Sequence, residues 1–112
     1  MQIQLTTTGA RSGKPRPVTL YAWEDGQRLV IVGSMGGSAR NPAWVHNLRA
    51  SPRATMARGR ESVEVTATEV IDPRERARLW QLVVGRFPLY AAYQRRTDRR
   101  IPLFVLEATR PD

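Results

Sequence analysis

The sequence predicts a mainly β (α+β) fold, in which antiparallel strands form a small closed or split barrel with short helices packed at its rim. Three observations support this prediction. Most apolar residues lie in short stretches that are separated by Gly and Pro turns. Helical periodicity is confined to three short segments in the middle and the C-terminal half. The length of 112 residues suits a single domain, 1–112.

The N-terminal third reads as three strands. Residues 3–7 alternate between apolar and polar side chains, which predicts a half-buried strand that ends at Gly9. After a turn, a second strand runs from about residue 16 to residue 23. A hairpin turn at Glu24-Asp25-Gly26 returns the chain as a third strand, 28–34. We expect these strands to form one antiparallel meander.

A short helix and a hairpin follow. Asn41 is a favourable N-cap residue, and Pro42 suits the first helical position, so a helix is expected from Pro42 to about Arg49. Ser51-Pro52 then stops the helix. Two strand-like stretches surround Arg58-Gly59-Arg60 and predict a hairpin, at residues 54–57 and 61–71.

The C-terminal part predicts two helices and a last strand. Asp72-Pro73-Arg74-Glu75 has the layout of a capping box, with proline at the first helical position. Pro88 ends this helix, a second helical segment spans 89–95, and a strand spans 101–106. The expected order is therefore βββαββααβ. The first of these helices has apolar residues at helical spacing, namely Trp80, Val83, Val84 and Phe87.

Composition limits the chemistry. The absence of cysteine excludes thiol catalysis and disulfides, and the single His46 argues against a histidine-rich metal site. The net charge of +8, carried almost entirely by arginine, calls for anionic partners. There is no apolar run that is long enough to span a bilayer and no signal-peptide pattern. We expect a cytoplasmic protein, with peripheral membrane contact as an alternative because its surface is basic.

Two segments predict an anion site. A small-residue loop, 33–38, follows the third strand and leads to the helix start at Asn41, where unpaired backbone N–H groups favour phosphate. Arg11, Lys14 and Arg16 lie around Gly13 in a second glycine turn, and we expect the two segments to clamp a phosphate or several carboxylates. The loop matches neither the Walker A nor the G-x-G-x-x-G pattern, and the alternative interpretation is a simple hairpin exit.

Aromatic side chains accompany these segments. Trp44 and Asn47 share one face of the first helix and offer an aromatic wall and an amide to a planar ligand, although Trp44 also suits the core. His46 lies elsewhere on the helical wheel and reads as a surface residue. Tyr90 and Tyr93 share a face and suit either proton donation and stacking or half-buried packing.

The order of these motifs resembles the deazaflavin (F420)-dependent nitroreductase and quinone reductase family. The resemblance implies a split β-barrel of the flavin-binding type with about six antiparallel strands, and coenzyme F420 as cofactor. It covers nearly the whole chain in five stretches: 6–16 (TTTGARSGKPR), 34–37 (SMGG), 41–48 (NPAWVHNL), 88–94 (PLYAAYQ) and 96–102 (RTDRRIP).

The resemblance also implies roles for individual residues. Positions that hold the phosphate-bearing tail of the cofactor match Ala10, Arg11, Ser12 and Arg16. The strand that flanks the tail matches Pro17, Val18, Thr19, Leu20 and Tyr21. The strand end against the deazaflavin ring matches Val32, Gly33, Ser34 and Met35. The helix start that completes the pocket matches Ala43, Trp44, Val45, His46 and Asn47.

Three residues are implied in catalysis. Ser34 would position the ring, while Tyr90 on the substrate side and its neighbour Tyr93 would hydrogen-bond or protonate the reduced oxygen. Two positions depart from the family pattern. Phe87 stands where relatives carry another tyrosine, and Met35 stands where a lysine occurs.

We therefore expect an oxidoreductase that transfers hydride from reduced F420 to a quinone or nitroaromatic acceptor. Because the coenzyme supplies the redox chemistry, no metal is needed. The alternatives are a non-catalytic deazaflavin-binding protein, an FMN-dependent oxidoreductase on the same barrel, and a basic nucleic-acid-binding barrel. No nucleic acid partner is expected, since the arginines cluster beside glycine turns rather than along a stripe. The sequence leaves both a monomer and a homodimer open.

Overall fold

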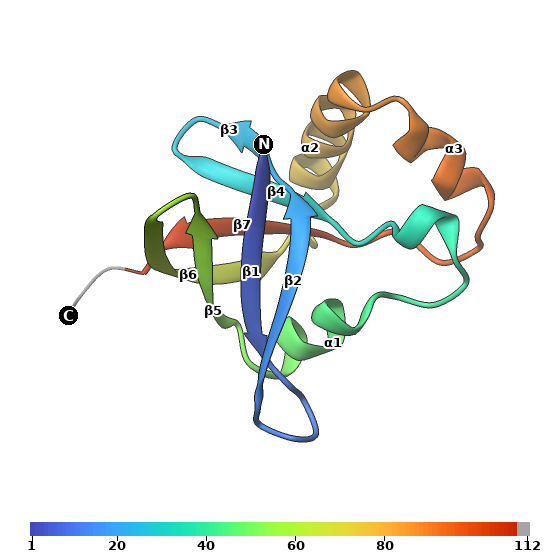
Figure 1. Ribbon diagram of the computed structural model, residues 1–112. Coiled ribbons are helices and arrows are strands. Elements are labelled where there is room, and N and C mark those ends of the chain that lie inside the picture. The colour runs from blue at the N-terminus through green and yellow to red at the C-terminus, as the bar shows by residue number, and fades with distance from the viewer. Residues whose placement is uncertain (110–112) are drawn as a thin grey trace.

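Seven antiparallel strands form one sheet that curls into a half-barrel, with three helices beside it (Figure 1). The computed structural model describes residues 1–109. The predicted mainly β, split-barrel fold class is confirmed. The strands are β1 (Gln2–Thr8), β2 (Pro15–Tyr21), β3 (Trp23–Asp25), β4 (Arg28–Val32), β5 (Arg53–Arg58), β6 (Glu61–Glu69) and β7 (Leu103–Ala108). The helices are α1 (Ala43–Ala50), α2 (Pro73–Arg86), α3 (Leu89–Arg95) and a short 3-10 turn, η1 (Met35–Gly37).

The predicted N-terminal meander is confirmed in its two antiparallel pairings, β1 with β2 and β3 with β4, but it is wrong as one continuous meander. The strand order is β2-β1-β5-β6-β7-β4-β3, so β2 and β3 follow each other in sequence but lie at opposite edges of the sheet. The expected strand 16–23 breaks at Ala22, which is fully buried and exchanges two backbone hydrogen bonds with Met1. The chain therefore passes from one edge of the curled sheet to the other at Ala22, and this break makes seven strands instead of six.

Strand β7 separates two apolar clusters. Phe104 and Leu106 face the inside of the curl, where α1 contributes Val45 and Leu48. Leu103 and Val105 face the opposite side, which α2 and α3 cover. Because both faces are buried, β7 is a continuous apolar run rather than an alternating one.

Helix α2 begins as predicted. The Asp72 carboxylate accepts a hydrogen bond from the backbone N–H of Glu75 at 3.0 Å. The buried face of this helix differs from the prediction at one position. Leu79 and Val83 are fully buried, whereas Trp80, which we expected on the core-facing side, is only half-buried.

The N-terminus of α1 corrects another prediction. Pro42, not Asn41, is the N-cap residue, and no side chain caps the helix. The Asn41 side chain turns away and accepts a hydrogen bond from Arg99 Nη1 at 2.7 Å. The expected N-capped anion site at Asn41 is therefore wrong. The helix ends at Ala50, one residue beyond the expected end.

Candidate functional site

A cleft of about 860 Å³ lies between the β1–β2 turn, strand β2 and helix α1. This volume is typical of small-molecule sites. The cleft unites the two segments that the sequence singled out, the turn with its arginines and the region from Met35 to α1. The predicted cofactor residues that line it are Ala10, Arg11, Ser12, Arg16, Pro17, Val18, Met35, Ala43, Trp44, His46 and Asn47.

The β1–β2 turn is held in one shape by short-range contacts. The Gly9 N–H donates to the carbonyl of Lys14 at 2.8 Å, and a Cβ at Gly9 would lie 2.5 Å from Ser12 Oγ. Ser12 Oγ accepts from Arg16 Nη2 at 3.3 Å. Among residues 1–109, neither Arg11 nor Arg16 forms an ion pair with a carboxylate. Two cations thus line the cleft without a carboxylate partner among the described residues.

Asn47 anchors this turn to α1. Its side-chain Oδ1 accepts from the Ala10 N–H at 2.9 Å, and its Nδ2 donates to Thr7 Oγ1 at 3.0 Å. The residue is 7% exposed, so these bonds are shielded from water. The amide that we expected to serve a ligand is therefore already used on both sides to place the turn.

The other helix residues divide between core and cleft. Trp44 is 5% exposed and packs edge-on against Phe104, with ring centroids 5.8 Å apart, so it is a core residue with one edge at the cleft. Val45 is fully buried. His46 is exposed and lies at the cleft border, which agrees with its reading as a surface residue.

Arg99 shapes the loop that closes the cleft near Met35. Its guanidinium donates four hydrogen bonds, at 3.0 Å to the Gly33 carbonyl and at 2.7 Å each to the Ser34 carbonyl, the Ser38 carbonyl and Asn41 Oδ1. Burial lowers the pKa of Arg99, but a guanidinium stays charged at neutral pH. Arg99 belongs to an arginine-rich stretch in which no position stands out, so its sequence context does not indicate this role.

Seven predicted cofactor residues lie outside the cleft lining. Val32, Gly33 and Val45 are buried, and a Cβ at Gly33 would lie 2.9 Å from a Val45 methyl carbon. Ser34 is half-buried, and its carbonyl is held by Arg99. The remaining three follow Val18 along β2, namely Thr19, Leu20 and Tyr21.

Tyr90 and Tyr93 belong to an aromatic cluster on the other side of η1. The Tyr90 hydroxyl accepts from Trp23 Nε1 at 2.9 Å, and its ring lies 4.8 Å from that of Phe87 and 6.4 Å from that of Tyr93. Tyr21 stacks on Trp23 at 6.1 Å and extends the cluster to the surface. Burial raises the pKa of Tyr90, so its hydroxyl keeps its proton at neutral pH.

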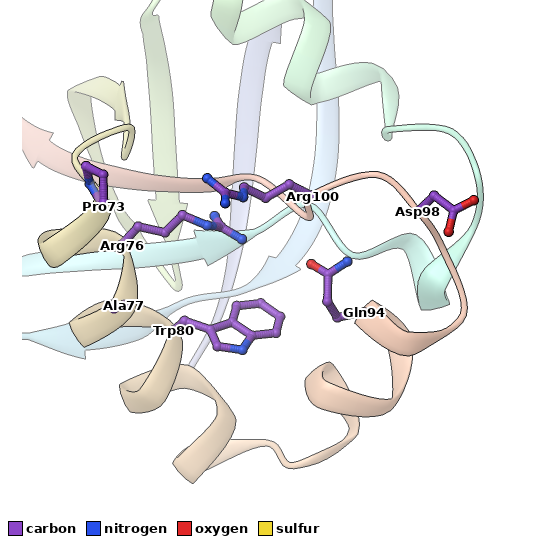
Figure 2. A pocket seen from close by; sticks show the side chains of 7 residues that line it. All are labelled: Pro73, Arg76, Ala77, Trp80, Gln94, Asp98 and Arg100. Atoms are coloured by element: carbon purple, nitrogen blue, oxygen red, sulfur yellow. The ribbon is translucent and has the colours of Figure 1, made fainter.

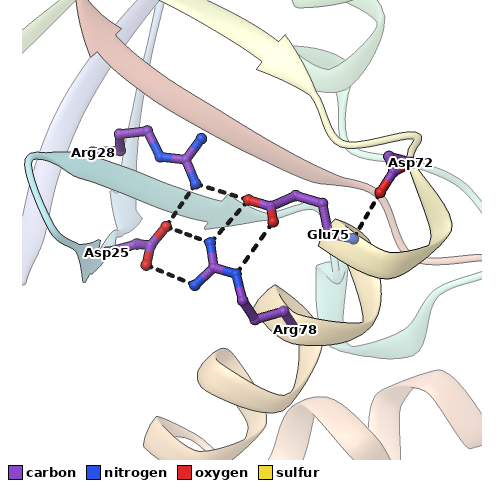
Figure 3. A network of polar contacts seen from close by, with 5 residues as sticks. All are labelled: Asp25, Arg28, Asp72, Glu75 and Arg78. Carbon is purple, nitrogen blue, oxygen red and sulfur yellow. Dashed lines mark hydrogen bonds and ion pairs between the residues drawn. The ribbon is translucent and has the colours of Figure 1, made fainter.

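A network of ion pairs links the β3–β4 hairpin to α2 (Figure 3). Asp25 and Glu75 each pair with both Arg28 and Arg78, at 2.7 to 2.9 Å. The guanidinium groups hold the pKa of Asp25 well below its usual range and lower that of Glu75 to about 2. These carboxylates are paired and lie outside the cleft, so they stabilise the fold rather than donate protons.

Comparison with known proteins identifies the family. The family model described as F420H(2)-dependent quinone reductase matches residues 1–108. The chain belongs to this family. It is therefore an oxidoreductase whose cofactor is reduced F420, as the resemblance of its motifs implied.

Individual relatives agree. The "F420H(2)-dependent quinone reductase Rv1261c" of Mycobacterium tuberculosis is 44% identical over 105 residues, which are 91% of this chain and 70% of the relative. A solved structure described as an F420-H2 dependent reductase, FDR-A, superposes with a TM-score of 0.83 at 39% identity and covers 95% of this chain and 93% of that one.

Two further structures are informative. One described as a domain-swapped dimer gives a TM-score of 0.84 at 39% identity, covering 95% of this chain and 79% of that one. HutZ from Vibrio cholerae, described as a heme storage protein, gives a TM-score of 0.70 at 13% identity, covering 98% of this chain and 82% of that one, and shows the fold alone. In the described part of the chain, every helix is too short or too polar to cross a bilayer.

Proposed function

We propose that this protein reduces a quinone with hydride from F420H2 that is bound in the cleft between the β1–β2 turn and α1. The observation that carries this proposal is the pair Arg11 and Arg16. Both cations line the cleft, and neither is neutralised by a carboxylate within residues 1–109. Guanidinium groups bind phosphate and carboxylate groups well, because their planar forks match two oxygens at once.

The residues of the cleft fit both the tail and the ring of the cofactor. F420 has a phosphodiester and an oligoglutamate tail, which suit the arginines of the turn. Its tricyclic ring needs an apolar slot, and the cleft offers the side chain of Met35 and the edge of Trp44. The cleft therefore has complementary surfaces for both the anionic tail and the planar ring.

The chain's own residues bind and orient. When bound, F420H2 supplies the hydride. Asn47 keeps the turn and its arginines in place, while the Arg99 fork fixes the segment that carries Ser34 and Met35, next to which we place the ring. A fixed segment restricts the orientation of the ring relative to the acceptor, which is the main contribution that a protein makes to such chemistry.

Tyr90 is our candidate proton donor. The residue is 7% exposed, and its hydroxyl accepts a hydrogen bond from Trp23 Nε1, which leaves the hydroxyl proton for an acceptor oxygen that reaches it. Tyr93 is its neighbour in the aromatic cluster, and this cluster would form the other wall of the acceptor site. Phe87 has no hydroxyl, so the candidate donors beside it are Tyr90 and Tyr93, the two tyrosines of α3.

Finer points stay predictions. They are nitroaromatic acceptors, use of FMN instead of F420, a cytoplasmic location, peripheral membrane contact and the absence of a nucleic acid partner. A non-catalytic role would require the chain to differ from the family to which it belongs. The domain-swapped dimer among the structural neighbours supports the homodimer over the monomer.

Coenzyme titration tests the binding site. We expect Arg11→Gln and Arg16→Gln each to weaken F420 binding about tenfold or more, since each removes a charge-assisted contact. Arg60→Gln is the matched control, because it removes the same charge from an exposed residue in the β5–β6 turn. Equal weakening by all three variants would reduce the site to bulk attraction and contradict the proposal.

Turnover tests the proton donor. Oxidation of F420H2 by menadione should slow at least about tenfold in Tyr90→Phe, because a positioned proton donor contributes about this much or more. The coenzyme affinity should stay within about twofold of the wild type, which separates chemistry from binding. Unchanged turnover in the double variant Tyr90→Phe with Tyr93→Phe would remove both residues from the mechanism.

A further inference from the structure

A second cleft lies between α2 and the segment that follows α3 (Figure 2). Its volume is about 460 Å³, and it shares no lining residue with the cofactor cleft. Arg76 and Trp80 reach it from α2, and Gln94 and Arg100 reach it from the other side. Neither the family assignment nor the proposed reaction gives this cleft a task.

Two arginines face each other in this cleft. Figure 2 shows the guanidinium groups of Arg76 and Arg100 pointing toward one another above the Trp80 ring. The central guanidinium carbon of Arg76 lies 5.7 Å from the Trp80 ring centroid. Burial and the charge of Arg100 both lower the pKa of Arg76. Two like charges that face the same cleft favour a bound anion between them.

The nearby carboxylates do not pair with these two arginines. Among residues 1–109, neither arginine forms an ion pair. Asp98 lines the cleft, but Figure 2 shows its carboxylate pointing away from both guanidinium groups. Glu69 acts on Arg76 only at longer range, because both of its oxygens accept from Arg49 at 2.8 Å.

The backbone around Arg100 is held in place. Gln94 Nε2 donates to the Arg99 carbonyl at 2.7 Å, and Gln94 Oε1 accepts from the Ile101 N–H at 3.0 Å. These two bonds fix the residues on both sides of Arg100, while the side chain of Arg100 stays exposed. A site with a fixed backbone loses less entropy on binding a ligand.

We propose that this cleft binds a small organic oxyanion, a phosphate monoester or a carboxylate, whose charged group lies between Arg76 and Arg100 and whose apolar part lies against Trp80. Two guanidinium groups supply paired donors for the oxygens, and the indole supplies the apolar surface. Such a ligand would bind whether or not F420 occupies the other cleft.

Titration in the absence of F420 tests this site. The probes are phenyl phosphate, benzoate and inorganic phosphate, with benzyl alcohol as the uncharged control, and the signal is the Trp80 indole N–H in a ¹⁵N–¹H spectrum, assigned with Trp80→Phe. The salt is about 150 mM, where the screening length is about 8 Å and long-range attraction is small. We expect a saturable shift with phenyl phosphate or benzoate, a weaker one with inorganic phosphate, and no saturable shift with benzyl alcohol. The better of the two aromatic probes then identifies the preferred oxyanion.

Three variants complete the test. Arg76→Gln and Arg100→Gln should each weaken probe binding about tenfold or more, whereas Arg86→Gln, at the far end of α2, should leave it unchanged. Arg100 is exposed, so Arg100→Gln provides the test even if removing the half-buried Arg76 unfolds the chain. No saturable shift up to about 20 mM probe, equal weakening by Arg86→Gln, or equal binding of benzyl alcohol would each overturn the proposal. Because no coenzyme is present, none of these results bears on F420 binding.

Discussion

Replacing Arg99 by lysine isolates the value of its planar fork. The substitution keeps the charge but removes the geometry, since one ammonium donates at most three hydrogen bonds from a single point. Arg99 now donates to acceptors on four residues, Gly33, Ser34, Ser38 and Asn41. In Arg99→Lys, at least one of these four acceptors loses its charged donor, and the others lose the planar geometry of the fork.

The magnitude follows from these bonds. A hydrogen bond to a charged group contributes about 1.5–3 kcal/mol, and water replaces part of this where the acceptor is half-exposed. We therefore expect Arg99→Lys to lower the free energy of unfolding by about 2–4 kcal/mol. In a domain of this size, that corresponds to a fall in Tm of roughly 8–20 °C.

Urea unfolding followed by tryptophan fluorescence measures the effect, and Arg95→Lys, which alters an exposed arginine of α3, is the control. F420 affinity should fall in Arg99→Lys as well, because Met35 lines the cleft from the segment that Arg99 holds. If the free energy of unfolding of Arg99→Lys lies within about 0.5 kcal/mol of that of the wild type, which is the usual range for a surface substitution, the fork does not shape the loop.

Three further predictions concern stability. Asn47→Ala should lower the free energy of unfolding by about 2–4 kcal/mol, because Thr7 and Ala10 lose a shielded partner, and a loss under 1 kcal/mol in urea would contradict this role. Gly37→Ala should destabilise the chain more than Gly26→Ala does in the same assay, because both have a positive φ but only at Gly37 would a Cβ meet backbone, 2.7 Å from the Tyr93 carbonyl oxygen. The folded-state pKa values of Asp25 and Glu75 are lowered, so their contribution to the free energy of unfolding is complete above about pH 4.5 and is lost as the pH falls toward 2. The Tm should therefore fall less steeply with decreasing pH in Asp25→Asn than in the wild type. Parallel curves of Tm against pH for the two proteins would contradict the network.

Local elements were predictable from the sequence, whereas their long-range order was not. The cap at Asp72 and the hairpin at residues 58–60 depend on neighbouring residues, and both are present. The sheet order depends on pairings between distant strands and on the break at Ala22, which has no turn signal. The predicted N-cap at Asn41 failed because a side chain 58 residues away captures it.

In the candidate site, too, local features were predictable from the sequence and tertiary contacts were not. Arg11 and Arg16 were identifiable because they flank a glycine turn, and they do line the cleft. The internal use of Asn47 and the fork of Arg99 depend on tertiary contacts that no spacing in the sequence indicates. Tyr90 was identifiable by its family motif, but its partner Trp23 lies 67 residues away.

A crystal structure of the protein with F420 would test the central claim most directly. We predict the phosphate group within hydrogen-bonding distance of Arg11 and Arg16, and the deazaflavin ring beside Met35 with its reactive face toward the side of Tyr90. A coenzyme whose phosphate lies elsewhere, for instance between Arg76 and Arg100, would contradict it.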